Sequence, residues 1–215
     1  PNFSGTLHLI FQPAEEGGGG ARVMIEDGLF ERFPCDAVFA MHNVPGFPTG
    51  HLGFASGPLM CSADTVHITL HGHGGHGAVP QSTVDPVVAC AAIVMSLQTI
   101  VARNIDPQET AIVTVGAMQA GQAANVIPAT ATLTLSVRAL TAVVRARLEQ
   151  RITELVTAQA ASFGARAEID YRHGYPVLVN HPAETELARA VALDWAGESQ
   201  VIPTLRPFTA SEDFA

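Results

Sequence analysis

Two adjacent glutamates, Glu15 and Glu16, are the residues whose types and position best fit catalytic chemistry. They follow an apolar, β-prone run at residues 6–11 and precede four glycines at residues 17–20. Open α/β sheets keep their sites beyond the carboxyl ends of strands, where this pattern places both carboxylates. Side chains of adjacent extended residues point to opposite sides, so one carboxylate can ligate a metal while the other faces the reacting water. Two solvated acids ahead of a helix N-terminus are an equally good interpretation.

His42 is the second candidate for this chemistry. It follows a predicted buried strand at residues 36–41, and residues 21–29 between the two strands predict a helix that ends near Gly28. If the strands of this βαβ unit are parallel, their carboxyl ends share one sheet edge, which brings Glu16 and His42 together. A carboxylate and an imidazole suit a divalent transition metal such as zinc. A structural histidine at a strand end is the alternative.

The composition indicates a globular protein and argues against polyanionic partners. The chain has 215 residues, of which 47% are hydrophobic and 14% charged, and its net charge is −9. Dispersed basic residues and this negative charge argue against nucleic acid or an anionic membrane as a partner. Three widely spaced cysteines, Cys35, Cys61 and Cys90, predict reduced thiols and a cytoplasmic location. The apolar run at residues 87–102 is too short and too polar to span a bilayer, and predicts a buried helix.

The middle of the chain has the alternating pattern of a small antiparallel sheet covered by helices. The predicted elements are strands at 64–71, 110–118, 130–138 and 166–171, and helices at 85–102 and 141–163. Their βαββαβ order is that of a ferredoxin-like sandwich. A further helix at residues 182–196 follows, so the sandwich is interpreted as a domain inserted at residues 62–174 into an α/β domain made of residues 1–61 and 175–215.

Within the predicted insertion, three histidines lie close together in a glycine-rich turn: His71, His73 and His76. They permit three interpretations: a metal-binding trio, a flexible turn with incidental histidines, or a turn in which His76 alone is functional. Asn125 precedes Val-Ile-Pro in a predicted turn, where asparagine is often structural. Arg138 lies at the end of an alternating strand, and taken by itself it is interpreted as a solvated residue there.

Taken in order, these motifs resemble those of aminoacylase-type dinuclear metallohydrolases, in the branch of hippurate hydrolases and N-acyl-amino-acid amidohydrolases. The likeness covers essentially the whole chain. The segments that carry it are residues 12–21, 41–43, 74–80, 84–86, 125–128, 137–138 and 211–214. The resemblance implies a partial zinc-peptidase-like α/β catalytic domain with an inserted ferredoxin-like lid and dimerisation domain.

The resemblance also implies a role for each candidate residue. Glu15 would be the general base, and Glu16 and His42 would be metal ligands. His76 would reach the site of a partner subunit and polarise the scissile carbonyl. Asn125 and Arg138 would bind the carboxylate or neighbouring polar groups of the substrate. The implied cofactors are two divalent ions, zinc, manganese, cobalt or nickel, and the implied substrate is a small N-acyl amino acid cleaved by a homodimer.

Two features set limits on this expectation. The family's remaining ligands, a Cys and a His upstream and a His downstream, would lie outside residues 1–215, so the chain is expected to be an inactive, metal-poor fragment. Gln81 and residues 136–140 depart from the usual motifs, which leaves substrate choice and the role of Arg138 open. The alternatives are a dipeptidase or carboxypeptidase of the same clan, and a non-catalytic dimerisation module. RNA binding is disfavoured because the two central strands lack aromatic residues.

Overall fold

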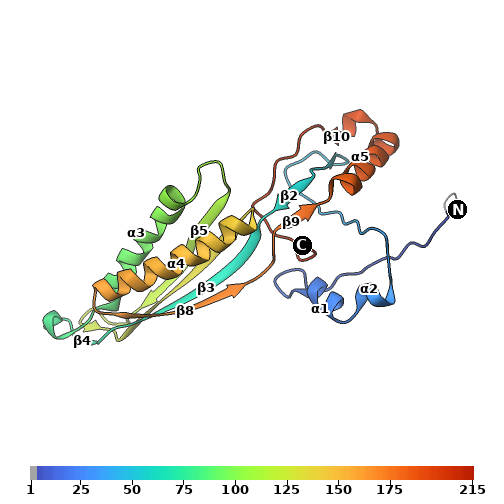
Figure 1. Cartoon of the computed structure of the whole chain (residues 1–215). Helices are drawn as coiled ribbons and strands as arrows, with labels where there is room; N and C mark the ends of the chain where they lie inside the picture. The colour runs from blue at the N-terminus through green and yellow to red at the C-terminus, as the bar shows by residue number, and fades with distance from the viewer. Residues whose placement is uncertain (1–3) are drawn as a thin grey trace. The chain divides into compact units, whose positions relative to one another are not determined.

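The computed structural model describes residues 4–215 and divides them into two compact units (Figure 1). The first unit comprises the described residues up to Leu59, together with Leu178–Pro207 and Glu212–Ala215. The second comprises Met60–Val177 and Phe208–Ser211. The second unit thus extends slightly beyond the predicted 62–174 at both ends and also includes a short segment near the carboxyl end of the chain.

The second unit is an antiparallel sheet with two long helices on one face (Figure 1). Its strands lie in the order β5-β7-β3-β8, and every neighbouring pair is antiparallel. The elements are β3 Ser62–His71, α3 Pro86–Asn104, β5 Ala111–Ala120, β7 Thr130–Ala139, α4 Ala142–Ser162 and β8 Arg166–His173. Their sequence order and this strand order together are those of a ferredoxin-like sandwich. Each predicted strand and helix of this region is present, with bounds shifted by a few residues.

The core of the second unit lies between the sheet and the helices. Alternate residues of β3 and β7 are buried while the others stay partly or fully exposed, as expected for a sheet covered on one face. The largest fully buried side chains are Val66, Ile68, Leu70, Ile93, Leu97, Ile100, Leu133, Leu135, Val137, Leu148, Ile152 and Val156. The helix α3 is long and apolar enough to cross a membrane by length and composition, which corrects the expectation that this run is too short and too polar. The expected burial is found, because several of its residues lie in this core, and this accounts for the apolar composition.

The two long helices begin at residues whose side chains cap them. The Asp85 carboxylate accepts from the backbone N–H of Val87 at 2.8 Å, and Pro86 occupies the first helical position. The Thr141 hydroxyl accepts from the N–H of Val144 at 3.2 Å. Local sequence and tertiary packing therefore favour the same structure here, which is why the sequence pattern predicts these helices.

The first unit contains short elements joined by long irregular segments. Its helices are α1 Gly20–Glu26, α2 Leu29–Arg32 and α5 Pro182–Ala196. The parallel pair β1 Leu52–Gly53 and β10 Val201–Ile202 and the pair β2 Gly57–Met60 and β9 Leu178–Asn180 are its only strand pairings among the described residues, with Met60 assigned to the second unit. The predicted helix at 182–196 is confirmed, and the one at 21–29 is present as α1 followed by α2.

The predicted strands at residues 6–11 and 36–41 are not formed, and this corrects the predicted βαβ unit. Both segments are irregular, and their apolar side chains are exposed: Phe11 by 85% and Met41 by 91%. A strand is stabilised by ladder hydrogen bonds and by burial of its side chains. Among residues 4–215 no strand pairs with either segment, so neither source of stability is present.

Candidate functional site

The two adjacent glutamates lie on a tight turn that the glycines make possible. The N–H of Gly17 donates to the carbonyl of Glu15 at 2.6 Å, and the N–H of Gly18 donates to that of Ala14 at 3.0 Å. Gly17 and Gly19 have φ of 83° and 64°, in the left-handed region that favours glycine. Ala14 also has a positive φ, 53°, which is costly for a residue with a Cβ. The backbone of this turn is therefore held in an unusual conformation around Glu15.

Gly20 is required for a different reason, close approach of the backbone. A Cβ at this position would lie 1.8 Å from the carbonyl oxygen of Pro13, far inside contact distance. Gly20 begins α1 and is buried, so the start of the helix packs directly on the start of the turn. The run of glycines is thus a steric requirement of the turn, which we call the acidic turn (residues 13–20).

The acidic turn brings Glu15 together with His42 and Glu212. One ligand atom from each of these three side chains lies within 4.8 Å of the other two, and the three belong to the first unit. The Nε2 atom of His42 is 4.0 Å from a carboxylate oxygen of Glu212. Glu212 is largely buried, with 14% of its side chain exposed, whereas that of His42 is 44% exposed. We call this group the cation cluster.

The tautomer of His42 is set by a second contact. Its Nδ1 lies 2.8 Å from the carbonyl oxygen of Asn43. A carbonyl only accepts, so Nδ1 carries the hydrogen and donates it. The lone pair of the imidazole is then on Nε2, the atom that faces the Glu212 carboxylate. Histidine ligands of metals are commonly oriented in this way by a backbone carbonyl.

The electrostatics of the cluster favour a positive charge. Burial, the Glu212 carboxylate and the Glu16 carboxylate raise the pKa of Glu15, in that order of size, against a lowering effect of His42. An ionised Glu15 is repelled by the neighbouring carboxylates that raise its pKa, and a bound proton or cation relieves that repulsion. Two carboxylates and one imidazole are ligands typical of zinc and manganese. The donor set therefore fits a divalent metal.

The structure distributes the predicted ligands differently from the sequence-based expectation. It places Glu15, not Glu16, beside His42, and Glu16 is an exposed residue whose charge acts on Glu15. Glu212 was not singled out from the sequence, although it lies in one of the motifs behind the resemblance. Only its position in that motif could have pointed to it, because an isolated acid 170 residues away from His42 gives no local signal.

Among the histidines of the glycine-rich turn, the described residues show no metal-binding group. Nε2 of His71 lies 3.2 Å from Glu168 on the neighbouring strand, and the backbone of His73 pairs with that of Val84. His76 lies on β4 Gly75–His76, which pairs with β6 Val126–Ile127. The three histidines therefore have different partners and do not form one group. His76 is the one that lies beside another candidate residue.

That neighbouring candidate is Asn125. The N–H of Gly77 donates to the carbonyl of Asn125 at 2.8 Å, so the two candidates share the β4-β6 pairing. The backbone N–H of Ala78 donates to Nδ1 of His76 at 3.1 Å. In the neutral ring Nδ1 is then the acceptor, and Nε2 carries a hydrogen that it can donate. His76 is exposed and is thus able to offer a hydrogen bond to a carbonyl oxygen.

Arg138 lies at the opposite end of the second unit. It is paired in register with Ala63 at the start of β3, whereas the other end of β7, Thr130, is paired with His71 at the end that leads to β4. Its guanidinium donates to the carbonyl of Thr209 at 2.9 Å. Thr130 and Arg138 are eight positions apart, which corresponds to about 26 Å along a strand. His76 and Asn125 on one side and Arg138 on the other therefore cannot contact one small molecule within a single copy of this unit.

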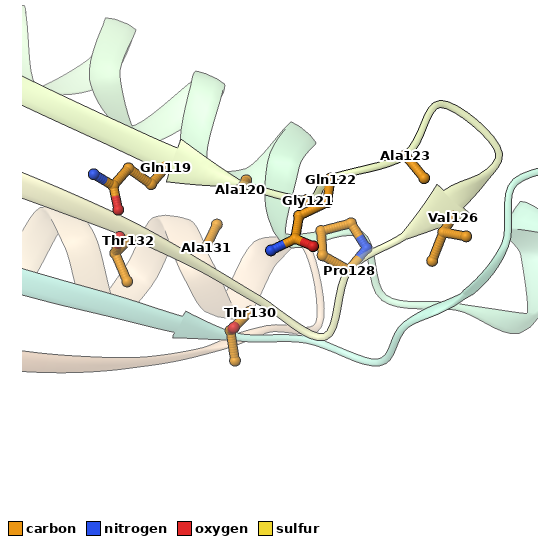
Figure 2. Close-up of a pocket in the computed structure, with 10 residues that line it drawn as sticks. All are labelled: Gln119, Ala120, Gly121, Gln122, Ala123, Val126, Pro128, Thr130, Ala131 and Thr132. Atoms are coloured by element: carbon orange, nitrogen blue, oxygen red, sulfur yellow. The ribbon is translucent and has the colours of Figure 1, made fainter.

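A polar hollow of about 640 Å³ lies next to the Asn125 loop, between the end of β5 and the start of β7 (Figure 2). Its lining combines the side-chain amides of Gln119 and Gln122 with the hydroxyls of Thr130 and Thr132. The hollow belongs to the second unit alone and is separate from the residues of the cation cluster.

A mixed α/β architecture with a cluster of carboxylates and an imidazole fits a protein that binds divalent metal. The chain belongs to the family described as Peptidase family M20/M25/M40, whose model matches residues 1–215. It is 42% identical over 213 residues to the hippurate hydrolase of Campylobacter jejuni, covering 99% of this chain and 56% of that protein. It is 38% identical over 214 residues to the N-acetyl-L-cysteine deacetylase of Bacillus subtilis, covering 100% and 50%.

The fold is also similar to that of solved structures. A dinuclear metal-binding peptidase of the M20 family from Bacillus subtilis matches with a TM-score of 0.77 and 31% identity, covering 95% of this chain and 50% of that one. The predicted family resemblance is confirmed by these matches. The chain spans about half the length of the curated relatives it matches.

Proposed function

We propose that the protein containing this chain hydrolyses the amide bond of N-acyl amino acids with the help of divalent metal ions. The observation that carries this proposal is the cation cluster of Glu15, His42 and Glu212. The names of two relatives support the substrate class, because hippurate and N-acetyl-L-cysteine are both amino acids acylated on nitrogen. The products would be a carboxylic acid and a free amino acid.

In this proposal Glu15 lies beside the metal as the general base. His42 and Glu212 of the cluster hold the metal together with Glu16, which the family resemblance implies as a ligand. Metal ions in such a site would supply Lewis acidity to the scissile carbonyl and a lower pKa for the attacking water. The Glu15 carboxylate would take the proton of that water and return it to the departing amine. The raised pKa of Glu15 supports this role, since a base that holds a proton more tightly is a better acceptor during attack. The imidazole of His42, fixed by Asn43, presents Nε2 for ligation.

We further propose that two copies of the second unit pair, which makes it a lid and dimerisation domain. The support is the separation within one copy: His76 and Asn125 lie at one end of the sheet, and Arg138 lies about 26 Å along β7 from its other end. If all three residues contact one substrate, His76 and Asn125 must come from a second copy. Because Nε2 of His76 is a free donor in this tautomer, it would stabilise the negative oxygen of the tetrahedral intermediate.

The edge formed by β5 and α3 supports the pairing. β5 is a ten-residue edge strand, and a long edge strand is a ready site for pairing with another copy. The neighbouring surface exposes Val88 and Met95 on α3, by 52% and 71%, and Met118 on β5 by 43%. These apolar side chains would be buried by an antiparallel pairing of two β5 strands, giving a symmetric interface.

The hydrolase proposal is tested with matched amide variants of the two adjacent glutamates. Glu15→Gln is expected to lower kcat by about 10²–10⁴-fold, the usual contribution of a general base, while bound metal stays near the wild-type level. Glu16→Gln is expected to lower bound metal as well as activity. Metal content is measured by elemental analysis after dialysis. Turnover is measured with hippurate, N-acetyl-L-cysteine and a dipeptide as substrates. Full activity of Glu15→Gln removes the proposed base, and faster cleavage of the dipeptide favours the peptidase alternative.

The pairing is tested by complementation. Protomers carrying Glu15→Gln and protomers carrying His76→Ala are co-expressed with different tags, and the mixed dimer is purified. One of its two sites then combines an intact Glu15 with an intact His76 from the other copy, so activity is expected to return to about half of wild type. A mixed dimer as inactive as its parents, or a strict monomer in light scattering, contradicts the proposed pairing.

A further inference from the structure

We propose that Asp213 is a positioning residue that holds the acidic turn in the conformation that presents Glu15 to the cation cluster. This inference deepens the proposed hydrolase function and rests on it. The side chain of Asp213 accepts hydrogen bonds from Gln12 and from the backbone of Ala21, so besides the effect of its charge on Glu15 it acts on the backbone that carries Glu15.

The first observation is that one carboxylate oxygen of Asp213 fastens both ends of the acidic turn. Its Oδ2 accepts from the side-chain amide of Gln12 at 2.8 Å and from the backbone N–H of Ala21 at 2.8 Å. Gln12 comes immediately before the turn and Ala21 immediately after it. A single atom thus closes the eight residues between them into a loop, with Glu15 inside it.

The second observation is that α1 lacks a local cap. Gly19, which precedes the helix, has no side chain to offer, and the first helical N–H groups need acceptors. Asp213 supplies that acceptor to Ala21 from 192 residues away in the sequence. Glycine at the N-cap position therefore leaves α1 without a side-chain cap, and a distant carboxylate accepts the hydrogen bond from Ala21 instead.

The third observation is burial. Asp213 is only 5% exposed, and its second oxygen, Oδ1, has no hydrogen-bond partner among the described residues. A buried carboxylate that is only half satisfied costs stability. A carboxylate at this place is explained better by the geometry it imposes than by a contribution to folding.

The adjacent residue connects this device to the cluster. Glu212 contributes its carboxylate to the cluster, and its other oxygen accepts from the N–H of Phe214 at 3.0 Å. The adjacent residues Glu212 and Asp213 thus act on the cluster in two ways. Glu212 lies beside His42, and Asp213 fixes the turn that carries Glu15. A displaced turn would move the Glu15 carboxylate away from its partners and would also move Glu16, the proposed metal ligand on the same turn, so metal binding and catalysis would both be weakened.

The test compares Asp213→Ala, Asp213→Asn and the control Asp194→Asn in the intact protein. Asp194 is an exposed carboxylate on α5 in the same unit, so it controls for loss of one negative charge. Hydrogen exchange of the Ala21 amide and Mn²⁺ affinity are measured on metal-free protein, and kcat and KM are measured with an N-acyl amino acid. Neither of the first two measurements depends on activity.

Asp213→Ala is expected to speed exchange at Ala21 and to weaken Mn²⁺ binding by about 10–100-fold, the usual effect of losing a residue that orients ligands. It is expected to lower kcat more than it changes KM. Asp213→Asn keeps one acceptor oxygen, so it should recover part of each loss at a similar Tm, and Asp194→Asn should change none of them.

The proposal would be overturned if Asp213→Ala had the same hydrogen-exchange rate at Ala21 and the same Mn²⁺ affinity as the wild-type protein. Losses in Asp213→Asn equal to those in Asp213→Ala, or losses that only follow a lowered Tm, would also overturn it, since they indicate a role in folding alone. If wild-type protein does not cleave N-acyl amino acids, the proposed function fails, while exchange and Mn²⁺ binding still decide the role of Asp213.

Discussion

The two units are stabilised in different ways. The contiguous hydrophobic core belongs to the second unit, where the sheet and two helices of 19 and 21 residues bury its side chains. In the described part of the first unit, Leu7, Leu9 and Phe11 are more than two-thirds exposed, and α1 has seven residues. The unit that holds the cation cluster is thus the one with little apolar burial.

This difference shows how the cluster is positioned. In the second unit, position follows from packing, because interiors are dense and tolerate little displacement. In the first, it follows from specific polar contacts and from glycines, such as the bonds of Asp213 and the close approach at Gly20. Substitutions in the hydrophobic core of the second unit should therefore mainly change stability, and those around the cation cluster of the first should mainly change metal binding and activity.

The largest expected effect is on stability, at Asp64 of the second unit. Its carboxylate is fully buried and accepts from Nε of Arg145 at 2.9 Å, from the hydroxyl of Tyr171 at 3.2 Å and from the N–H of Gly174 at 3.1 Å. Asp64→Ala leaves the largely buried Arg145 without its partner and should lower the free energy of unfolding by about 3–5 kcal/mol. Denaturant unfolding followed by far-UV circular dichroism measures this loss. A loss no larger than that of Asp194→Asn, a surface control, contradicts this expectation.

The next largest effect is expected at Gly20 of the first unit, where a substitution should lower catalytic activity and metal binding but leave stability nearly unchanged. In Gly20→Ala the new Cβ meets the backbone oxygen of Pro13, so the acidic turn must move. A displacement of about 1 Å at a catalytic group can lower kcat by about 10²-fold, and Mn²⁺ affinity should fall with it. Gly116→Ala is the matched control, because a Cβ there meets nothing closer than 3.9 Å. The proposed difference between the units is contradicted if the Gly20→Ala protein binds metal as the wild type does. It is also contradicted if the midpoint of the main unfolding transition falls strongly in this variant.

The same contrast explains what the sequence predicted. In the second unit, alternation at residues 64–71, the caps Asp85 and Thr141 and the apolar face of α4 are local signals, and the packing agrees with each of them. The elements and their order could therefore be predicted from short windows of sequence.

In the first unit, the informative contacts are long-range. Residues 6–11 have the composition of a strand, but composition does not supply a pairing partner, and they remain irregular. The bonds of Asp213 join residues 201 and 192 positions apart, and no periodicity encodes them. Glu15, Glu16 and His42 were found because their side chains carry chemistry, whereas the place of Glu212 in the cluster depends on how the chain folds back.

The smallest of these effects concerns alkaline pH and a buried thiol of the second unit. Burial raises the pKa of Cys90 from 9.0 to about 11. Because the folded pKa lies above the unfolded value, the associated stability is complete below about pH 9 and is lost as the pH rises toward about 11. The loss should be about 2–3 kcal/mol or less, by the usual relation between pKa shift and free energy. Burial also raises the pKa of Tyr171, followed by the Asp64 carboxylate, which adds a loss of the same sign above about pH 10.

Urea unfolding under reducing conditions at several pH values separates these contributions. Cys90→Ala should flatten the decline that begins near pH 9, although its starting stability is lower because a buried side chain is shortened. Cys35→Ala, which removes an exposed thiol of the first unit, should leave the pH dependence as in wild type. An unchanged slope in Cys90→Ala would mean that this thiol ionises in the folded protein as readily as in the unfolded chain. The packing that distinguishes the second unit would then not exclude water from its core at α3.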